Sequence, residues 1–85
     1  GWVDPATVGH IGRYAGFLGQ EFGGEVDTWG TLNEPFATTL SGYLQPSADR
    51  SAPPGRFLDG ASVVATLTHQ IEGSAVIYDG IKAFD

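Results

Sequence analysis

The amino-acid sequence predicts an α/β fold in the order helix, strand, long loop, helix. Apolar residues recur at helical spacing near both ends of the chain, and a short segment rich in β-formers lies between them. A hydrophobic content of 41% with 12% aromatic residues is typical of a folded protein. At 85 residues, however, the chain buries little of its surface and is marginal alone.

A first helix is predicted over residues 5–22. Asp4 can cap its start, and Pro5 suits the first helical position because no bond is lost there. One apolar stripe comprises Val8, Ile11, Ala15, Leu18 and Phe22. A neighbouring stripe comprises Gly9, Gly12, Gly16 and Gly19. The glycines indicate either the close approach of another helix or compositional drift in a Gly-rich chain.

A strand is predicted over residues 26–33, because Thr28, Trp29 and Thr31 favour strands and the run is bounded by Gly24 and Pro35. A single strand has no ladder partner in this chain, so its backbone groups must pair with strands elsewhere. Residues 35–58 are then expected to form a loop with room for a short helical turn.

A second helix is predicted over residues 60–84, with Asp59 or Ser62 as its cap. Its expected buried stripe comprises Val64, Leu67, Ile71, Ala75, Tyr78 and Ile81.

The charge balance excludes some classes of partner. Ten acidic residues against four basic ones give a net charge of −6, which argues against nucleic acid and against an anionic membrane surface. No apolar run approaches the ~20 residues that span a bilayer. Without cysteine or a His cluster at zinc spacing, we expect no metal and no cofactor. The compartment stays open, with the cytoplasm slightly favoured.

The candidate site is Asn33-Glu34-Pro35, where the predicted strand ends and the long loop begins. Pro35 biases Glu34 toward an extended backbone, which would direct the carboxylate into a cleft bordered by the loop. Such a carboxyl group can act as a general acid, and Asn33 can hydrogen-bond a substrate hydroxyl. On pattern alone, an Asn-Glu-Pro turn is more often a helix cap or a solvent-facing turn.

The string Trp29-Gly-Thr-Leu-Asn-Glu-Pro-Phe36 resembles the acid/base signature of glycoside hydrolase family 1, the β-glucosidase family. In that family W-x-T-x-N-E-P ends the fourth strand of a (β/α)8 barrel. Further stretches resemble the family in the same order: Gly1-Trp2-Val3, Arg13-Tyr14-Ala15, Phe22-Gly23, Ser41-Gly42-Tyr43 and Ala52-Pro53-Pro54. The resemblance implies that residues 1–85 are one segment of a TIM barrel, from its third helix through its fourth, and not a complete domain.

The resemblance also implies roles for two residues. Glu34 would be the general acid/base of a retaining β-glycosidase that hydrolyses β-glucosides, and Asn33 would bind the sugar 2-hydroxyl. The family's nucleophile lies in a T/S-E-N-G string, which this sequence lacks. The expected partners are therefore a carbohydrate substrate and the remainder of the barrel, in the same or a second chain. Alone, the segment is expected to be inactive.

Two other interpretations stay open. The chain can be a non-catalytic barrel fragment that associates through Leu18, Leu67 and Ile71. It can also be a carbohydrate-binding module that uses Trp2, Trp29 and Tyr43, although such modules are commonly β-sandwiches. One departure from the family is Glu72-Gly73-Ser74-Ala75, which stands where a second His is usual. We interpret it as a change in packing.

Overall fold

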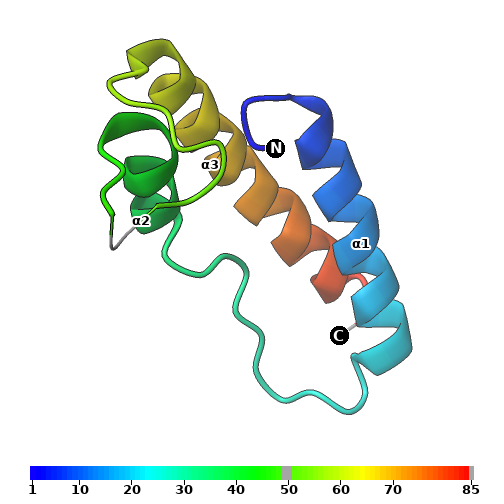
Figure 1. Cartoon of the computed structure of the whole chain (residues 1–85). Helices are drawn as coiled ribbons and strands as arrows, with labels where there is room; N and C mark the ends of the chain where they lie inside the picture. The colour runs from blue at the N-terminus through cyan, green and yellow to red at the C-terminus, as the bar shows by residue number, and fades with distance from the viewer. Residues whose placement is uncertain (49–50, 85) are drawn as a thin grey trace.

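The structure is a computed structural model that describes residues 1–48 and 51–84. Two long helices, α1 (Ala6–Phe22) and α3 (Gly60–Lys82), lie side by side (Figure 1). A short helix α2 (Pro35–Thr39) continues directly into a π-helix η1 (Leu40–Leu44), and both contact α3. The predictions of helices over residues 5–22 and 60–84 are confirmed to within two residues at each end.

The predicted strand over residues 26–33 is wrong, and with it the α/β barrel segment as the fold class. Residues 23–34 form turns and irregular coil that run from α1 to α2, and no strand occurs among residues 1–48 and 51–84 (Figure 1). Within that part of the chain, no backbone N–H from Asp27 to Glu34 donates to a backbone carbonyl. A strand without a ladder partner leaves these groups unpaired, so residues with strand propensity stay in coil.

The predicted loop over residues 35–58 begins instead with α2 and η1. Its later part folds back onto η1, because the N–H groups of Arg56 and Leu58 donate to the carbonyls of Gly42 and Leu44 at 2.7 and 2.9 Å. Residues 49 and 50 of this loop, and residue 85, lie outside the described residues.

The contact between α1 and α3 is lined by glycine. A Cβ added at Gly19 would lie 3.0 Å from Ile81 Cα, and one added at Gly80 would lie 3.0 Å from Gly16 N. The two backbones therefore touch where side chains would normally separate them. Close helix approach is therefore confirmed as the reason for Gly19, and Gly12 contacts Val76 of α3, whereas a Cβ at Gly9 would meet only Arg13 of the same helix. A small core of Ala15, Ile77 and Ile81 continues the contact.

This packing decides which face of α3 is buried. Small or polar residues make up most of the buried residues of α3. The buried residues are Ser62, Thr66, Gln70, Gly73, Ile77 and Ile81. Three members of the stripe expected to be buried are exposed instead: Val64 by 66%, Ile71 by 74% and Tyr78 by 57%. Ala75 is exposed as well, Leu67 is half-buried and Ile81 is buried, so most of the expected stripe is wrong. Gly80 meets the α1 backbone at Gly12 and Gly16, and Gly73 receives the ring of Trp2, which precedes α1. This packing turns most of the apolar stripe outward.

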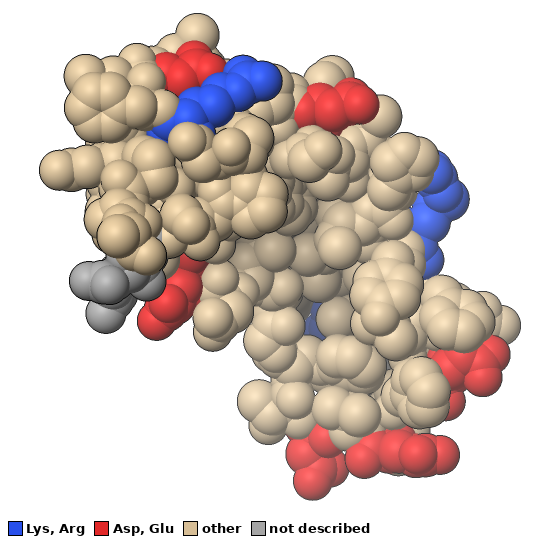
Figure 2. Space-filling model, viewed as in Figure 1, with Lys and Arg blue, Asp and Glu red and all other residues tan. Residues whose placement is uncertain are grey.

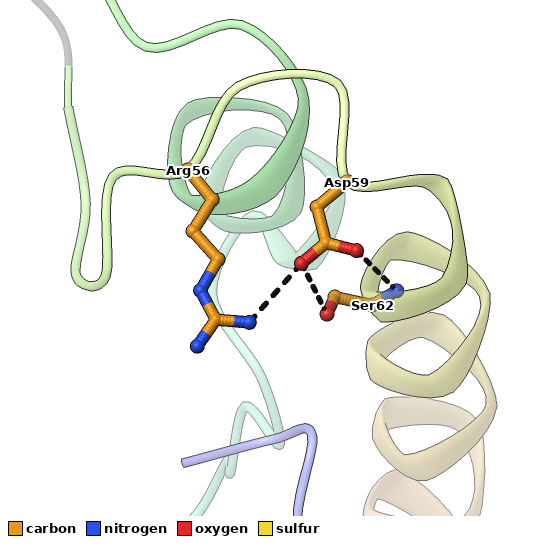
Figure 3. A network of polar contacts seen from close by, with 3 residues as sticks. All are labelled: Arg56, Asp59 and Ser62. Carbon is orange, nitrogen blue, oxygen red and sulfur yellow. Dashed lines mark hydrogen bonds and ion pairs between the residues drawn. The ribbon is translucent and has the colours of Figure 1, made fainter.

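A polar network caps the start of α3 (Figure 3). Asp59 accepts hydrogen bonds from Ser62 N at 3.2 Å and Ser62 Oγ at 2.7 Å, and it forms an ion pair with Arg56 at 3.1 Å. These bonds, with that from the Ser62 hydroxyl first, lower the pKa of Asp59 below its ordinary value of 3.8. Asp59 is the N-cap of α3, as the sequence predicts.

The molecule is thin and exposes much apolar surface. Its Cα extents are 42 × 25 × 14 Å and its radius of gyration is 14.3 Å, against about 12 Å for a compact chain of this length. The accessible surface is 5635 Å², whereas a folded protein of this mass exposes roughly 4,800 Å². Charged side chains lie mainly at the edges of the face in Figure 2, and its middle is almost uncharged. No described helix is long and apolar enough to cross a membrane.

We expect Gly19→Ala to lower the thermal midpoint and Gly16→Ala to raise it. A Cβ at residue 19 meets the α3 backbone at 3.0–3.3 Å, whereas one at residue 16 meets nothing within 4 Å. Both changes gain about 1 kcal/mol of helix propensity. Only the first has an overpacking cost of about 1–3 kcal/mol. Circular dichroism melts of the two variants measure the difference, and equal midpoints would contradict the close contact.

Because Asp59 caps α3 as a carboxylate, we expect part of the free energy of unfolding to be lost in acid. A lowered pKa means that the carboxylate stabilises the fold above the ordinary value of 3.8 and that this contribution is lost as the pH falls through the lowered value. Asp59→Asn keeps a capping side chain without the charge. The melting curves of the parent and Asp59→Asn chains should therefore differ most above pH 4 and converge at lower pH. A difference that does not depend on pH would argue against the network.

Candidate active site

Asn33 and Glu34 lie at the point where the coil after α1 enters α2. Both residues are exposed. Glu34 is the N-cap of α2, and its backbone carbonyl accepts a hydrogen bond from Thr38 N at 3.2 Å. Its carboxylate has no hydrogen bond or ion pair within the described part of the chain. The side chain is therefore free to meet a molecule from outside.

Glu34 has a left-handed backbone, with φ 44° and ψ 59°. The expectation that Pro35 holds Glu34 extended is therefore wrong. Pro35 occupies the first position of α2, which suits its fixed φ, and Glu34 has to turn the chain from coil into that helix. A non-glycine residue in this conformation costs roughly 1–2 kcal/mol. Strain of this kind persists only where surrounding contacts enforce it, and it often marks functional sites.

Two side-chain pairs hold the strained segment on α3. Before Glu34, Thr31 Oγ1 lies 3.0 Å from Ser74 Oγ. After it, the Thr39 hydroxyl lies 3.1 Å from Gln70 Oε1 and 2.9 Å from the Pro35 carbonyl. Each net hydrogen bond contributes about 0.5–1.5 kcal/mol, so the two anchors together are of the same size as the strain.

A groove of about 740 Å³ lies between this segment and α3. Its walls are mostly apolar and comprise Thr31, Leu32, Pro35, Leu67, Gln70, Ile71, Ser74, Ala75, Tyr78 and Asp79. Glu34 does not line the groove but directly precedes Pro35, which does. Asp79 is the one acidic residue among the lining residues. The outward stripe of α3 thus lines a groove that the chain reaches at the residue after Glu34.

The candidate sugar-stacking aromatics are used for packing. A Cβ at Gly73 would lie 2.7 Å from the Trp2 ring, and His69 Nδ1 lies 2.6 Å from the Trp2 carbonyl oxygen. Trp29 packs against the core, and Tyr43 is buried. Trp2 and Trp29 are half-buried and Tyr43 is buried, so packing takes up much of all three rings. The Trp2 contact also gives a packing reason for a glycine at residue 73.

No group of three or more His, Cys, Asp or Glu residues able to hold a metal ion is found among residues 1–48 and 51–84. The site that the structure brings together therefore consists of one exposed carboxylate, the neighbouring amide of Asn33 and an apolar groove. Such an arrangement can donate or accept a proton, and it can receive an apolar or hydroxyl-bearing group beside it.

Comparisons with known proteins identify the family. The sequence profile of Glycosyl hydrolase family 1 matches residues 1–84. The chain is 41% identical to a beta-galactosidase of Pyrococcus woesei over all 85 residues, which is 16% of that protein. It is 40% identical over 42 residues, half of the chain, to beta-glucosidase 31 of Arabidopsis thaliana, of which this is 8%.

A third relative is a cyanidin 3-O-glucoside 7-O-glucosyltransferase (acyl-glucose) of Delphinium grandiflorum, with 36% identity over 59 residues, 67% of the chain and 12% of that protein. No solved structure matches the chain. The chain belongs to Glycosyl hydrolase family 1, and the predicted family resemblance is confirmed. It spans about a sixth or less of the length of these curated relatives.

Sequence reasoning identified Asn33 and Glu34 as candidates but missed the residues that hold them. Thr39 and Gln70 are buried polar residues separated by 31 positions. Neither stands in a motif, and a polar residue in a helical pattern is normally read as solvent-facing. The one available signal was the spacing of Gln70 and Ser74, which places them on one face of α3.

We expect Glu34→Gly to raise the thermal midpoint relative to Glu34→Gln. Glycine adopts positive φ without the steric cost, whereas glutamine keeps it. The gain should be up to about 1 kcal/mol once the entropy of glycine in the unfolded chain is subtracted. Thermal melts of the two variants test this. If Glu34→Gly melts at or below the temperature of Glu34→Gln, Glu34 is not strained.

Proposed function

We propose that this chain is the acid/base-bearing segment of a retaining β-glycosidase of the β-glucosidase type, which hydrolyses O-glycosidic bonds of β-glucosides. The observation that carries the proposal is the string from Trp29 to Phe36 in a chain that the family profile matches over residues 1–84. Further support comes from the position of Glu34, which is exposed and strained at the edge of an apolar groove.

In the proposed mechanism, Glu34 first acts as an acid. It donates its proton to the glycosidic oxygen as the bond from that oxygen to the sugar carbon breaks. A carboxylate from elsewhere in the enzyme attacks the same carbon and forms a glycosyl ester. Glu34, now ionised, then takes a proton from water, which attacks that carbon and releases the sugar and the second carboxylate. Asn33 hydrogen-bonds the sugar 2-hydroxyl and strengthens this bond in the transition state.

The second carboxylate must come from the remainder of the enzyme, in the same chain or in a partner chain. We propose that residues 1–85 are a single segment of the family's catalytic domain and are inactive alone. The large exposed apolar side chains, including Phe36, Phe57, Val64, Ile71 and Tyr78, support this, because a complete domain would cover much of this surface.

A chimera tests the role of Glu34. Residues 1–85 replace the corresponding stretch of the Pyrococcus woesei beta-galactosidase, and hydrolysis of 4-nitrophenyl β-glucoside and β-galactoside is followed. In the chimera, Glu34→Gln should lower kcat by about 10²–10⁴-fold, because the general acid and base are lost. Glu25→Gln, another exposed glutamate of the chain, is the matched control and should leave kcat unchanged.

The pattern of rescue separates the acid role from a structural one. A 2,4-dinitrophenyl glucoside needs little protonation of its leaving group, so its first step should survive Glu34→Gln. Azide needs no base to attack the glycosyl ester, so it should restore turnover and yield a glycosyl azide. A loss of activity that neither reagent rescues would count against Glu34 as acid/base. The isolated chain of 85 residues is the negative control. If it hydrolysed the substrate and Glu34→Gln abolished that activity, the proposal that the chain is inactive alone would be wrong.

The alternative function is a non-catalytic fragment that associates with other chains. The exposed stripe on α3, with Ile71 74% exposed, is the observation that favours it. Native mass spectrometry of the purified chain separates the two. A larger assembly with glycosidase activity supports the enzyme, and a larger assembly in which Glu34→Gln changes nothing supports the association role.

A further inference from the structure

We propose that Thr39 and Gln70 are positioning residues for Glu34. Their buried contact holds the first turn of α2 against α3 and thereby keeps Glu34 in its left-handed conformation at the groove edge. This inference rests on the proposed acid/base role of Glu34. It adds two residues that lie outside the string from Trp29 to Phe36 and that act through the backbone of Glu34.

The first step of the argument is burial. Thr39 is 1% exposed and Gln70 is 4% exposed, and their side chains lie 3.1 Å apart on two different helices. Buried polar groups are costly unless they are paired, and the Thr39 hydroxyl is the hydrogen-bond partner of the buried Gln70 Oε1. The one proton of this hydroxyl is shared with the Pro35 carbonyl, which lies 2.9 Å away. The pair therefore specifies where α2 docks on α3, which apolar contacts alone would leave free to slide.

The second step links the pair to Glu34. The Thr39 hydroxyl also lies 2.9 Å from the carbonyl of Pro35, the residue after Glu34. One turn along α3 from Gln70, Ser74 holds Thr31 before Glu34 at 3.0 Å. Glu34 thus lies between two anchors on one face of α3. The Thr31–Ser74 pair is exposed and the Thr39–Gln70 pair is buried, so the buried pair contributes more to the geometry.

A second buried threonine provides a control for Thr39. Thr66 of α3 is 0% exposed, and its hydroxyl has no hydrogen-bond partner within the described residues. The fold thus contains two fully buried threonines, one with a partner on another helix and one without. Replacing each by valine keeps the shape of the side chain and removes only the hydroxyl. The two variants therefore form a matched pair.

The experiment measures the backbone of Glu34 in the full 85-residue chain by NMR, from HN–Hα couplings and backbone chemical shifts, with circular dichroism as the check on total helix. Thr39→Val should shift the equilibrium between docked and undocked α2 by about fivefold, the effect of one buried hydrogen bond. The positive φ of Glu34 should be lost in proportion. Thr39→Ser, which keeps the hydroxyl, should restore it, and Thr66→Val should leave it unchanged.

Gln70→Met removes the polar partner at similar length and should reproduce the effect of Thr39→Val. The double variant should be no worse than either single one, because both remove the same contact. If Thr39→Val also lowers the total helix content, the variants Gln70→Met and Thr39→Ser test the proposal in its place. A native Glu34 φ in Gln70→Met, or its loss in Thr39→Ser with total helix intact, overturns the proposal, and so does an equal effect of Thr39→Val and Thr66→Val.

The kinetic arm uses the chimera. There, Thr39→Val should lower kcat by up to about 10²-fold with little change in KM, because misplacing the acid affects chemistry more than binding. Thr66→Val should change neither. Failure of the Glu34 acid/base role would appear as an active Glu34→Gln chimera. Failure of the positioning role would appear as an unchanged Glu34 backbone in Thr39→Val, so the two failures are distinguishable.

Discussion

The rest of the structure depends on the glycine-lined contact between α1 and α3. Gly19 and Gly80 let the backbones of the two helices approach so closely that an added Cβ atom would lie 3.0 Å from the backbone of the opposite helix. Each helical glycine costs roughly 1 kcal/mol of helix propensity relative to alanine. That cost is offset only if the helices pack against each other. The orientation of α3 follows from this contact, because the small residues that permit it all lie on one of its faces.

The same helix also carries the groove and the contacts of the candidate site. The buried Gln70 and its neighbour Ser74 hold the segment that contains Glu34. The exposed Ile71 and Tyr78 line the groove together with Gln70 and Ser74. A change in the α1–α3 contact would rotate α3 and move all of these residues together. The strained backbone of Glu34 therefore depends on glycines with which it has no contact.

Much of the fold could be predicted from the sequence where the determinants are local. Both long helices and the Asp59 cap follow from periodicity and capping residues within a few positions. The prediction of a strand failed because the stability of a strand depends on backbone partners that the described residues do not contain. The prediction of which face of α3 is buried failed because periodicity identifies an apolar stripe but does not say what covers it. There, backbone contact through glycine overrides the hydrophobic pattern.

The candidate site shows the same division. The string from Trp29 to Phe36 singles out Glu34, but the anchoring of Glu34 through Thr39 and Gln70 depends on a pairing across 31 positions. A carboxylate exposed on a chain only 14 Å thick also stands in bulk water, where electrostatic interactions are weak. Catalytic proton transfer requires a second carboxylate and the exclusion of water, which a single layer of helices does not supply. What the structure of this chain shows is the geometry of one exposed carboxylate. The proton transfer proposed for Glu34 would need further surfaces that exclude water around it.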